Sequence, residues 1–303
     1  MNEGLTPDCR LCGSNEAQTI RANTVYGGST ASKFYECGQC GVFYQYPFLS
    51  PEEEHKFYVE EFEAFMASRS GDDGGWEEDL DSHKAANIAN INRRTEYLRD
   101  LVWQGASVLE IGCSSGFMFD TYGRLGAACV EGVEPSGKFS SLLKKKGYTI
   151  YAALDDIPQS KVFSLVTNYF VFEHISDPRK FINSCMDHVA PKGKLVCEIP
   201  LANDILANQF CVTAFDDFYW SVAHHFYYTK KSLDYLMAPM EFRFSLKADQ
   251  RYDLSNHLVW LKDGKPGGQG LFASLLGEDL DEMYKKRLKD LWCCDTAILT
   301  VYK

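Results

Sequence analysis

The stretch V-L-E-I-G-C-S-S-G-F-M-F, residues 108–119, decides the fold of this chain. The apolar run at 106–111 predicts a buried strand, and the pattern at 117–123 predicts the start of a helix. Gly112 and Gly116 lie in the turn between these two elements. Glycine adopts a positive φ without strain and has no Cβ, so a ligand can approach the backbone of such a turn closely.

A second strand is expected at the spacing of a βαβ unit. It spans residues 128–133, and Glu134 follows it, 24 positions after Glu110. Ligands of open α/β sheets bind at the carboxyl ends of the strands. An acid at Glu134 can accept hydrogen bonds from the two hydroxyls of a ribose. The two strands together predict a nucleoside-binding unit.

The turn differs from that of dinucleotide-binding proteins. Their G-x-G-x-x-G pattern brings a helix amino end onto a pyrophosphate. This chain has Glu110-x-Gly112-x-x-x-Gly116, with Cys113 and Ser114 where a second glycine would be needed. A carboxylate directly before the turn repels phosphates and suits a ligand that carries positive charge.

The segment E-I-G-C-S-S-G resembles motif I of the class I S-adenosylmethionine (SAM) methyltransferases, and G-V-E-P-S at 132–136 resembles their second motif. The resemblance implies an α/β fold with a Rossmann-like sheet and flanking helices, and SAM as cofactor. The residues that we expect to contact SAM are Glu110, Gly112, Cys113, Gly116, Phe117, Glu134, Pro135, Asp155, Asp156 and Asn168.

Asp155 and Asp156 follow a third predicted strand at 148–151, after a predicted helix at 137–146. Members of the family often place an acid there beside the adenine amino group. The two aspartates are equally typical of a helix start, so both interpretations stay open.

Two C-x-x-C pairs near the amino end predict a structural zinc site. They are Cys9 with Cys12 and Cys37 with Cys40. Four thiolates close a tetrahedral shell and leave no open position for catalysis. A redox dithiol would not explain two matched pairs. The segment between the pairs suits a zinc ribbon with a hairpin, which could turn at residues 27–28.

Composition narrows the class of protein. The chain has 303 residues, 45% hydrophobic and 14% aromatic, which is ample for a packed core. No apolar run is long enough to span a membrane, and the amino end lacks a signal-peptide pattern, so we expect a cytoplasmic protein. Eleven cysteines without a disulfide-like framework fit that location. The net charge of −11 disfavours a nucleic-acid partner.

A lead-in region precedes the nucleoside-binding unit. A helix is expected to start at Ser50 or Pro51, and the polar, glycine-rich residues 68–75 predict a mobile loop. The pattern at 81–103 is helical and resembles the helix that covers the cofactor pocket in this class. Arg93 and Arg94 could touch substrate, but we interpret them as a solvated face.

The string F-E-H-I-S-D-P follows the fourth predicted strand, at 162–167. It resembles the motif found at this place in a methyltransferase branch whose members act on sugars or small metabolites. Asn168 and Tyr169 are expected to face the cofactor and to position the acceptor. His174 could take a proton from a substrate hydroxyl, or could instead cap the next helix.

Residues 200–231 are rich in aromatic side chains and are expected to form a roof over the substrate. The string that begins His224-His225 resembles a family motif in which His225 matches the histidine and His224 replaces a glutamate. His225 and His174 are both candidates for the general base. A metal at the paired histidines is disfavoured, because the sequence shows no carboxylate partner at a suitable spacing.

The remaining elements complete the class I pattern. They are a fifth strand at 194–199 after a P-K-G turn, a strand at 241–247, an apolar run at 256–262, a helix at 277–290 and a closing antiparallel strand at 296–302. The predicted organisation is a zinc ribbon at 1–48, a helical lead-in or lid at 49–104, and a methyltransferase domain at 105–303 with the roof at about 200–235.

The sequence predicts methyl transfer from SAM to a small polar acceptor, most often a sugar or nucleotide sugar in enzymes of this resemblance. His225, His174 and Tyr169 are the catalytic candidates. A methyltransferase on RNA or protein that uses the ribbon as reader, and a non-catalytic SAM-binding module, are the alternatives. The acceptor atom and the oligomeric state stay open.

Overall fold

The computed structural model describes residues 7–61, 65 and 80–303. The loop predicted at 68–75 lies outside these residues. A seven-stranded sheet in the order β10-β11-β8-β7-β4-β5-β6 forms the centre of the molecule. Its strands are β4 (Ser107–Ile111), β5 (Cys129–Val133), β6 (Thr149–Tyr151), β7 (Phe163–Tyr169), β8 (Val189–Pro200), β10 (Arg243–Asp249) and β11 (Thr296–Tyr302).

The topology confirms the predicted Rossmann-like fold. Strands β6, β5, β4, β7 and β8 run parallel to one another, and β11 runs antiparallel between β8 and β10. The order reverses between β4 and β7, and such a switch point is where doubly wound sheets bind ligands. The predicted turn at 112–116 leaves β4 at this point.

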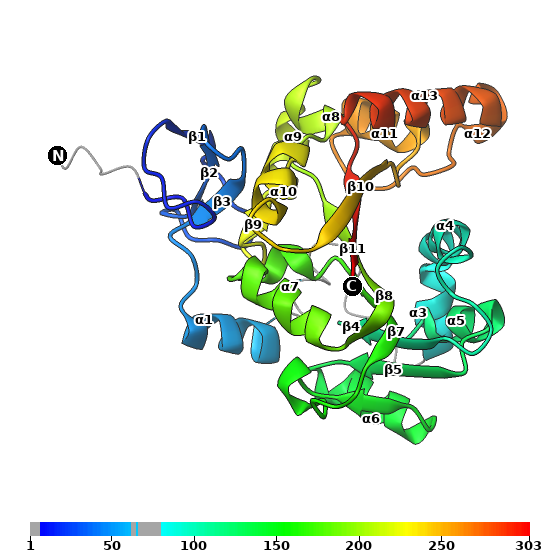
Figure 1. Ribbon diagram of the computed structural model, residues 1–303. Coiled ribbons are helices and arrows are strands. Elements are labelled where there is room, and N and C mark those ends of the chain that lie inside the picture. The colour runs from blue at the N-terminus through cyan, green and yellow to red at the C-terminus, as the bar shows by residue number, and fades with distance from the viewer. Residues whose placement is uncertain (1–6, 62–64, 66–79) are drawn as a thin grey trace.

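Helices cover both faces of the sheet (Figure 1). One core contains Val108 and Leu165 of the sheet with side chains of α4, α5 and α6. The other contains Leu109 and Val166 with side chains of α7 and α10. The bounds are α3 (Leu80–Ala86), α4 (Ile88–Leu98), α5 (Phe119–Leu125), α6 (Gly137–Lys145), α7 (Pro178–Asp187), α8 (Ile205–Asn208), α9 (Thr213–Tyr219), α10 (Lys230–Met237), α11 (Leu254–Asp263), α12 (Ala273–Leu276) and α13 (Glu278–Leu291).

Several element boundaries differ from the sequence prediction. The helix expected at 81–103 is two helices that break at Asn87, and the apolar run at 256–262 is a helix, α11. The P-K-G turn lies inside β8, where Lys192 has φ of +66° and the register with β7 shifts. β7 extends to Tyr169, so Asn168 and Tyr169 are strand residues.

The amino-terminal region forms a second sheet from β1 (Gln18–Ala22), β2 (Lys33–Cys37), β3 (Phe43–Tyr46) and β9 (Phe226–Tyr227). Strand β9 comes from the segment after β8 and pairs antiparallel with β3. The ribbon and the predicted roof are therefore joined by backbone hydrogen bonds (Figure 1). The fully buried Trp220 stacks on Phe43 and packs against Phe34 at this joint.

Helix α1 (Pro51–Lys56) begins where the sequence predicts, with Ser50 as its amino cap. The Ser50 hydroxyl accepts a hydrogen bond from the Glu53 backbone N–H, and the Glu53 carboxylate accepts one from the Ser50 N–H. This capping box satisfies two backbone donors at the helix start. None of the described helices is long and apolar enough to cross a bilayer.

Candidate active site

The turn after β4 is closely packed against its neighbours. Gly112 and Gly116 both have φ of +69°. A Cβ at Gly112 would lie 2.5 Å from Val171 Cγ2, and one at Gly116 would lie 2.7 Å from Leu143 Cδ2. Both positions therefore require glycine, for conformation and for space.

Glu134 holds this turn against the end of β5. Its carboxylate accepts hydrogen bonds from the backbone N–H groups of Ser114 at 2.6 Å and Ser136 at 2.8 Å. Burial raises the pKa of Glu134, although these two hydrogen bonds oppose the shift. A carboxylate has about four lone-pair sites, so each oxygen can still accept a ribose hydroxyl.

Glu110 lies at the end of β4 with only 2% of its surface exposed. Its Oε2 atom has no hydrogen-bond partner in the part of the chain that the structure describes. Burial raises the pKa of Glu110 to about 8, against the opposing charge of Arg94. A buried acceptor without a partner is costly, and a ligand that brings positive charge to this place would remove that cost.

A network of buried charges surrounds the end of β8. Glu198 contacts Arg93 Nη2 at 2.6 Å, Arg94 Nη2 at 3.0 Å and the Tyr97 hydroxyl at 2.9 Å. Arg94 is 2% exposed, so the expectation that it forms a solvated face is wrong. Its guanidinium also lies 4.0 Å above the centre of the Tyr169 ring.

Tyr169 lies beneath that guanidinium, and its hydroxyl is 2.8 Å from the hydroxyl of Tyr122. Burial raises the pKa of Tyr169. The contact between the Tyr169 ring and the Arg94 guanidinium packs Arg94 against the sheet. Phe170, the next residue, has φ of +55°, and Arg251 lies 4.1 Å above its ring. Backbone strain of this kind is common at functional sites.

His174 lies in a short turn after β7 and bonds a backbone carbonyl. Its Nδ1 is 2.7 Å from the Ala223 oxygen, and its Nε2 is 4.0 Å from Glu173 Oε1. The ring of His224 packs edge-on against it. The candidate ligand atoms of Glu173, His174 and His224 lie within 4.8 Å of one another. The fold thus provides the carboxylate that the sequence spacing does not show.

His225 lies between the ribbon and α1. Its Nδ1 accepts a hydrogen bond of 2.7 Å from Arg10 Nη1, and its Nε2 lies 3.3 Å from Glu54 Oε1. Only 5% of His225 is exposed. The two histidines predicted as bases therefore have different surroundings.

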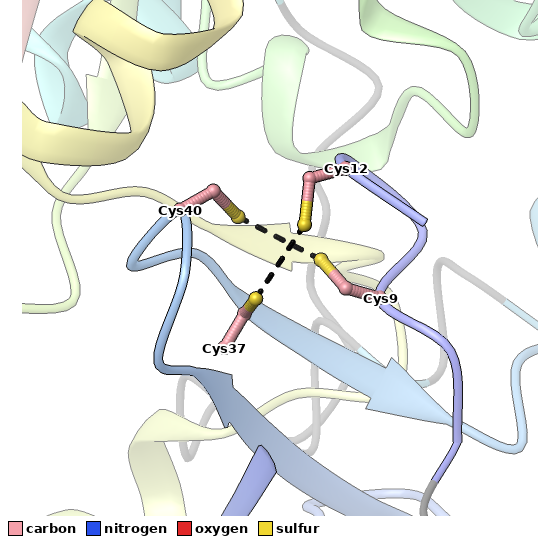
Figure 2. Close-up of side chains that lie close together, drawn as sticks. All are labelled: Cys9, Cys12, Cys37 and Cys40. Atoms are coloured by element: carbon pink, nitrogen blue, oxygen red, sulfur yellow. Dashed lines mark hydrogen bonds between the residues drawn. The ribbon is translucent and has the colours of Figure 1, made fainter. Parts of the chain in front are cut away.

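The four amino-terminal cysteines converge at one point (Figure 2). The Sγ atoms of Cys9 and Cys40 lie 3.7 Å apart, and those of Cys12 and Cys37 lie 3.6 Å apart. Zinc–thiolate bonds of about 2.3 Å in a tetrahedron give sulfur separations of about 3.8 Å. The arrangement is compatible with the predicted zinc ribbon.

The two C-x-x-C turns that carry these cysteines have the same geometry. The Gly13 N–H donates to the Cys9 oxygen at 2.7 Å, and the Gly41 N–H donates to the Cys37 oxygen at 2.8 Å. The two glycines have φ of +77° and +75°. Matched turns bring two pairs of thiols to one centre, as a tetrahedral metal site requires.

A family model for a methyltransferase domain matches residues 82–243, which is more than half of the chain. The chain belongs to this methyltransferase family. The match covers the turn after β4, Glu134 and the His174 segment. The match supports the predicted class of SAM-dependent methyltransferases over the alternative of a non-catalytic binding module.

Curated relatives support the class. The methyltransferase is 28% identical over 178 residues to the mitochondrial ubiquinone biosynthesis O-methyltransferase of Schizosaccharomyces pombe, covering 55% of this chain and 64% of the relative. It is 32% identical over 117 residues to the ubiquinone biosynthesis O-methyltransferase of Dinoroseobacter shibae, covering 34% and 46%. The chain thus spans between about half and two thirds of the relatives' lengths.

Among solved structures, a SAM-dependent methyltransferase from Archaeoglobus fulgidus is similar, with a TM-score of 0.49 and 16% identity. The similarity covers 80% of this chain and all of that one.

The other residues predicted to contact SAM differ in how exposed their side chains are. Cys113 is buried, with its Sγ against Gly132. Phe117 is partly exposed and Pro135 is exposed. The Asn168 amide is fully buried and donates to Cys197 Sγ at 3.1 Å, and burial raises the pKa of that thiol to about 12.

Asp155 and Asp156 are exposed in a short helical turn at Leu154–Asp156. The Asp156 carboxylate accepts a hydrogen bond of 2.9 Å from the Ala153 N–H. It therefore caps its own turn, as one of the two sequence interpretations expects. Whether either aspartate also contacts adenine stays a prediction.

The predicted aromatic roof is mostly core. Trp220, Phe226, Tyr227 and Tyr228 are fully buried, and Phe210 is 44% exposed. Three of the buried rings belong to β9 or the residue next to it, at the joint with the ribbon. Rings in this segment therefore hold the ribbon on the sheet, and few of them are free to stack on an acceptor.

Proposed function

We propose that this methyltransferase moves the methyl group of SAM to a hydroxyl oxygen of a small acceptor, with His174 as general base. One contact carries the choice of base. A backbone carbonyl can only accept a hydrogen bond, so His174 Nδ1, 2.7 Å from the Ala223 oxygen, holds the ring proton. In the neutral ring the lone pair is then on Nε2, the atom that can take a proton.

Glu173 supports this role. Its carboxylate is 1% exposed and lies 4.0 Å from His174 Nε2. After proton uptake the imidazolium would carry a positive charge beside this buried carboxylate, which would stabilise it.

His225 has the opposite arrangement. An arginine guanidinium can only donate, so the Arg10 contact requires the lone pair on Nδ1. The Nε2 atom then carries the hydrogen and faces Glu54. With its acceptor atom already bonded to Arg10, His225 is a poorer base than His174. We assign it a structural role.

Glu110, Glu134 and the backbone of the turn at 112–116 would hold SAM. When bound, SAM supplies an electrophilic methyl group on a sulfonium centre. The chain mainly orients the acceptor for in-line attack and removes the hydroxyl proton. Arg94 packs over the Tyr169 ring at the carboxyl end of β7, beside this site.

We propose that Cys9, Cys12, Cys37 and Cys40 hold a structural zinc ion. Their sulfur separations and paired turns support the proposal. Four protein ligands complete the shell, so the metal takes no part in the methyl transfer.

The acceptor class has two candidates. The relatives are named as O-methyltransferases of ubiquinone biosynthesis, which favours a hydroxyl on a quinone precursor. The F-E-H-I-S-D-P string favours a sugar hydroxyl. The acidic balance of the chain disfavours RNA.

The test measures methyl transfer from SAM to a panel that contains a catechol and a nucleotide sugar. His174→Ala should lower kcat by at least about a hundredfold, the usual contribution of a general base. SAM affinity, measured by calorimetry, should stay within about twofold, since the base does not hold the cofactor.

His188→Ala is the matched control. His188 Nδ1 also contacts a backbone carbonyl, that of Lys161, at 2.9 Å. It lies at the end of α7, away from the strand ends that carry the site. Full turnover in His174→Ala would refute the assignment of the base.

A further inference from the structure

Arg10 lies in the chain between Cys9 and Cys12, two of the ribbon cysteines. Its Nη1 donates to His225 Nδ1 at 2.7 Å. Its guanidinium lies 3.7 Å from the centre of the Phe48 ring and 5.5 Å from that of Phe226. Stacking fixes the plane of the guanidinium, so the hydrogen bond to His225 has one defined direction.

His225 is held by its backbone as well. Its N–H donates to the Glu173 oxygen at 2.9 Å, and its oxygen accepts from the Gln45 N–H at 3.1 Å. The residue therefore connects the first C-x-x-C turn, the end of β3 and the turn that carries His174.

Other contacts between the ribbon and the methyltransferase sheet are of a different kind. The Lys231 ammonium donates to the Gly38 oxygen at 3.1 Å and is exposed, and the Thr229 hydroxyl donates to the Gly41 oxygen at 3.0 Å. They attach the second C-x-x-C turn to α10. Neither reaches His225 or the turn at Phe172–His174.

We propose that Arg10 is a positioning residue, through which the metal-bound ribbon fixes the tautomer and place of His225 and so the turn that carries His174. The inference rests on the proposed zinc site and the proposed base. Bound zinc would hold Cys9 and Cys12, and Arg10 lies between these two residues in the chain. A ribbon without metal would release Arg10, and the His174 turn would lose one of its supports.

The tautomer gives a readout that needs no acceptor. Full-length, zinc-loaded protein with ¹⁵N-labelled histidine rings reports by NMR which ring nitrogen carries hydrogen. The His225 signals are identified by their loss in His225→Gln. In the wild type, hydrogen should be on Nε2 alone.

Arg10→Ala should shift the His225 ring nitrogen signals, because Nδ1 loses its donor, and so should removal of zinc from the wild type with a chelator. Glu54 also favours hydrogen on Nε2, so Arg10→Ala combined with Glu54→Gln should give a mixture of tautomers. Arg10→Lys keeps a charged donor and should retain part of the preference. Lys231→Ala, which removes a cation from the other C-x-x-C turn, should leave the spectrum unchanged. Hydrogen on Nδ1 in the wild type, or an unchanged His225 spectrum in Arg10→Ala, would overturn the proposal.

Activity then separates this proposal from the one on which it rests. Arg10→Ala should keep its zinc and its SAM affinity and lose between about tenfold and a hundredfold in kcat, because the base is misplaced rather than removed. If the His225 signals shift in Arg10→Ala but His174→Ala keeps full turnover, Arg10 does position His225, and His174 is not the general base. If His174→Ala loses turnover as expected, full kcat in Arg10→Ala would refute the positioning role of Arg10.

Discussion

Glu110 and Glu198 are both buried glutamates at the carboxyl ends of parallel strands in one sheet. Their partners differ. Glu198 binds two arginines and a tyrosine, and although burial opposes ionisation, the charges of Arg94 and Arg93 lower its pKa to about 2. Burial raises the pKa of Glu110 to about 8, and one of its oxygens has no partner among the described residues.

The difference distinguishes a carboxylate whose charge is compensated within the chain from one that we propose a ligand compensates. The partners of Glu198 come from α4, so its charge is compensated within the chain. For Glu110, the charge of Arg94 and a hydrogen bond from Tyr122 oppose the effect of burial but do not overcome it, and Oε2 has no partner among the described residues. The positive charge of SAM would compensate the Glu110 carboxylate, which the chain itself compensates only in part.

The largest expected effect comes from Glu198→Gln. The change leaves Arg94 buried without a counter-charge, which costs about 3 to 5 kcal/mol in the free energy of unfolding. Denaturant titration measures it. Arg99→Ala is the control: it removes an exposed pair with Glu96 and should cost less than about 1 kcal/mol. A similar small loss in both variants would show that the buried network is not what holds α4.

Glu110→Gln should have the reverse profile. We expect the free energy of unfolding to stay the same or rise, because no buried carboxyl then resists ionisation. SAM affinity should fall by at least about tenfold, since hydrogen bonds to a charged group contribute about 1.5 to 3 kcal/mol. Calorimetry measures the affinity. Unchanged SAM binding would exclude Glu110 from the cofactor site.

The pH dependence of stability should distinguish wild type from Glu110→Gln. The unfolded chain loses the Glu110 proton near its ordinary pKa of 4.5, whereas the folded chain keeps it up to about 8. The folded state therefore binds more protons between these values, and the unfolding free energy of the wild type falls relative to the variant as pH rises. Unfolding curves at about pH 5 and pH 8 test this. Parallel pH profiles would mean that Glu110 is ionised in the folded protein.

The same two glutamates show what the sequence can predict. Glu110 belongs to a continuous motif, in which strand, turn and helix follow each other, so local pattern is sufficient. The motif spacing also predicts the order of the later strands. Glu198 belongs to no such local motif, because its arginine partners lie about a hundred residues earlier in the chain.

A clue to Arg94 was present in helical periodicity. Ile91, Arg94 and Leu98 lie on one stripe of α4, and all three are buried. A charged residue on an apolar stripe indicates a buried partner. The strand pairing of β9 with β3 has no such clue, because β9 is only two residues long and lies more than 180 positions after the β3 residues that it pairs with, so it has no periodicity of its own. Tertiary contacts alone decide it.

The smallest expected effect is at the end of β6, where the turn at Leu154–Asp156 offers a carboxylate outside the buried set. If Asp156 mainly caps its turn, Asp156→Ala should cost about 1 kcal/mol in the free energy of unfolding, as loss of a cap does. SAM affinity should change by less than about twofold. Asp155→Ala, which removes the neighbouring exposed acid without the cap, is the control for stability. A tenfold loss of SAM affinity in either variant, measured by the same calorimetry as for Glu110→Gln, would instead place an acid beside the adenine. Asp155 or Asp156, at the end of the edge strand β6, would then bind the cofactor together with Glu110.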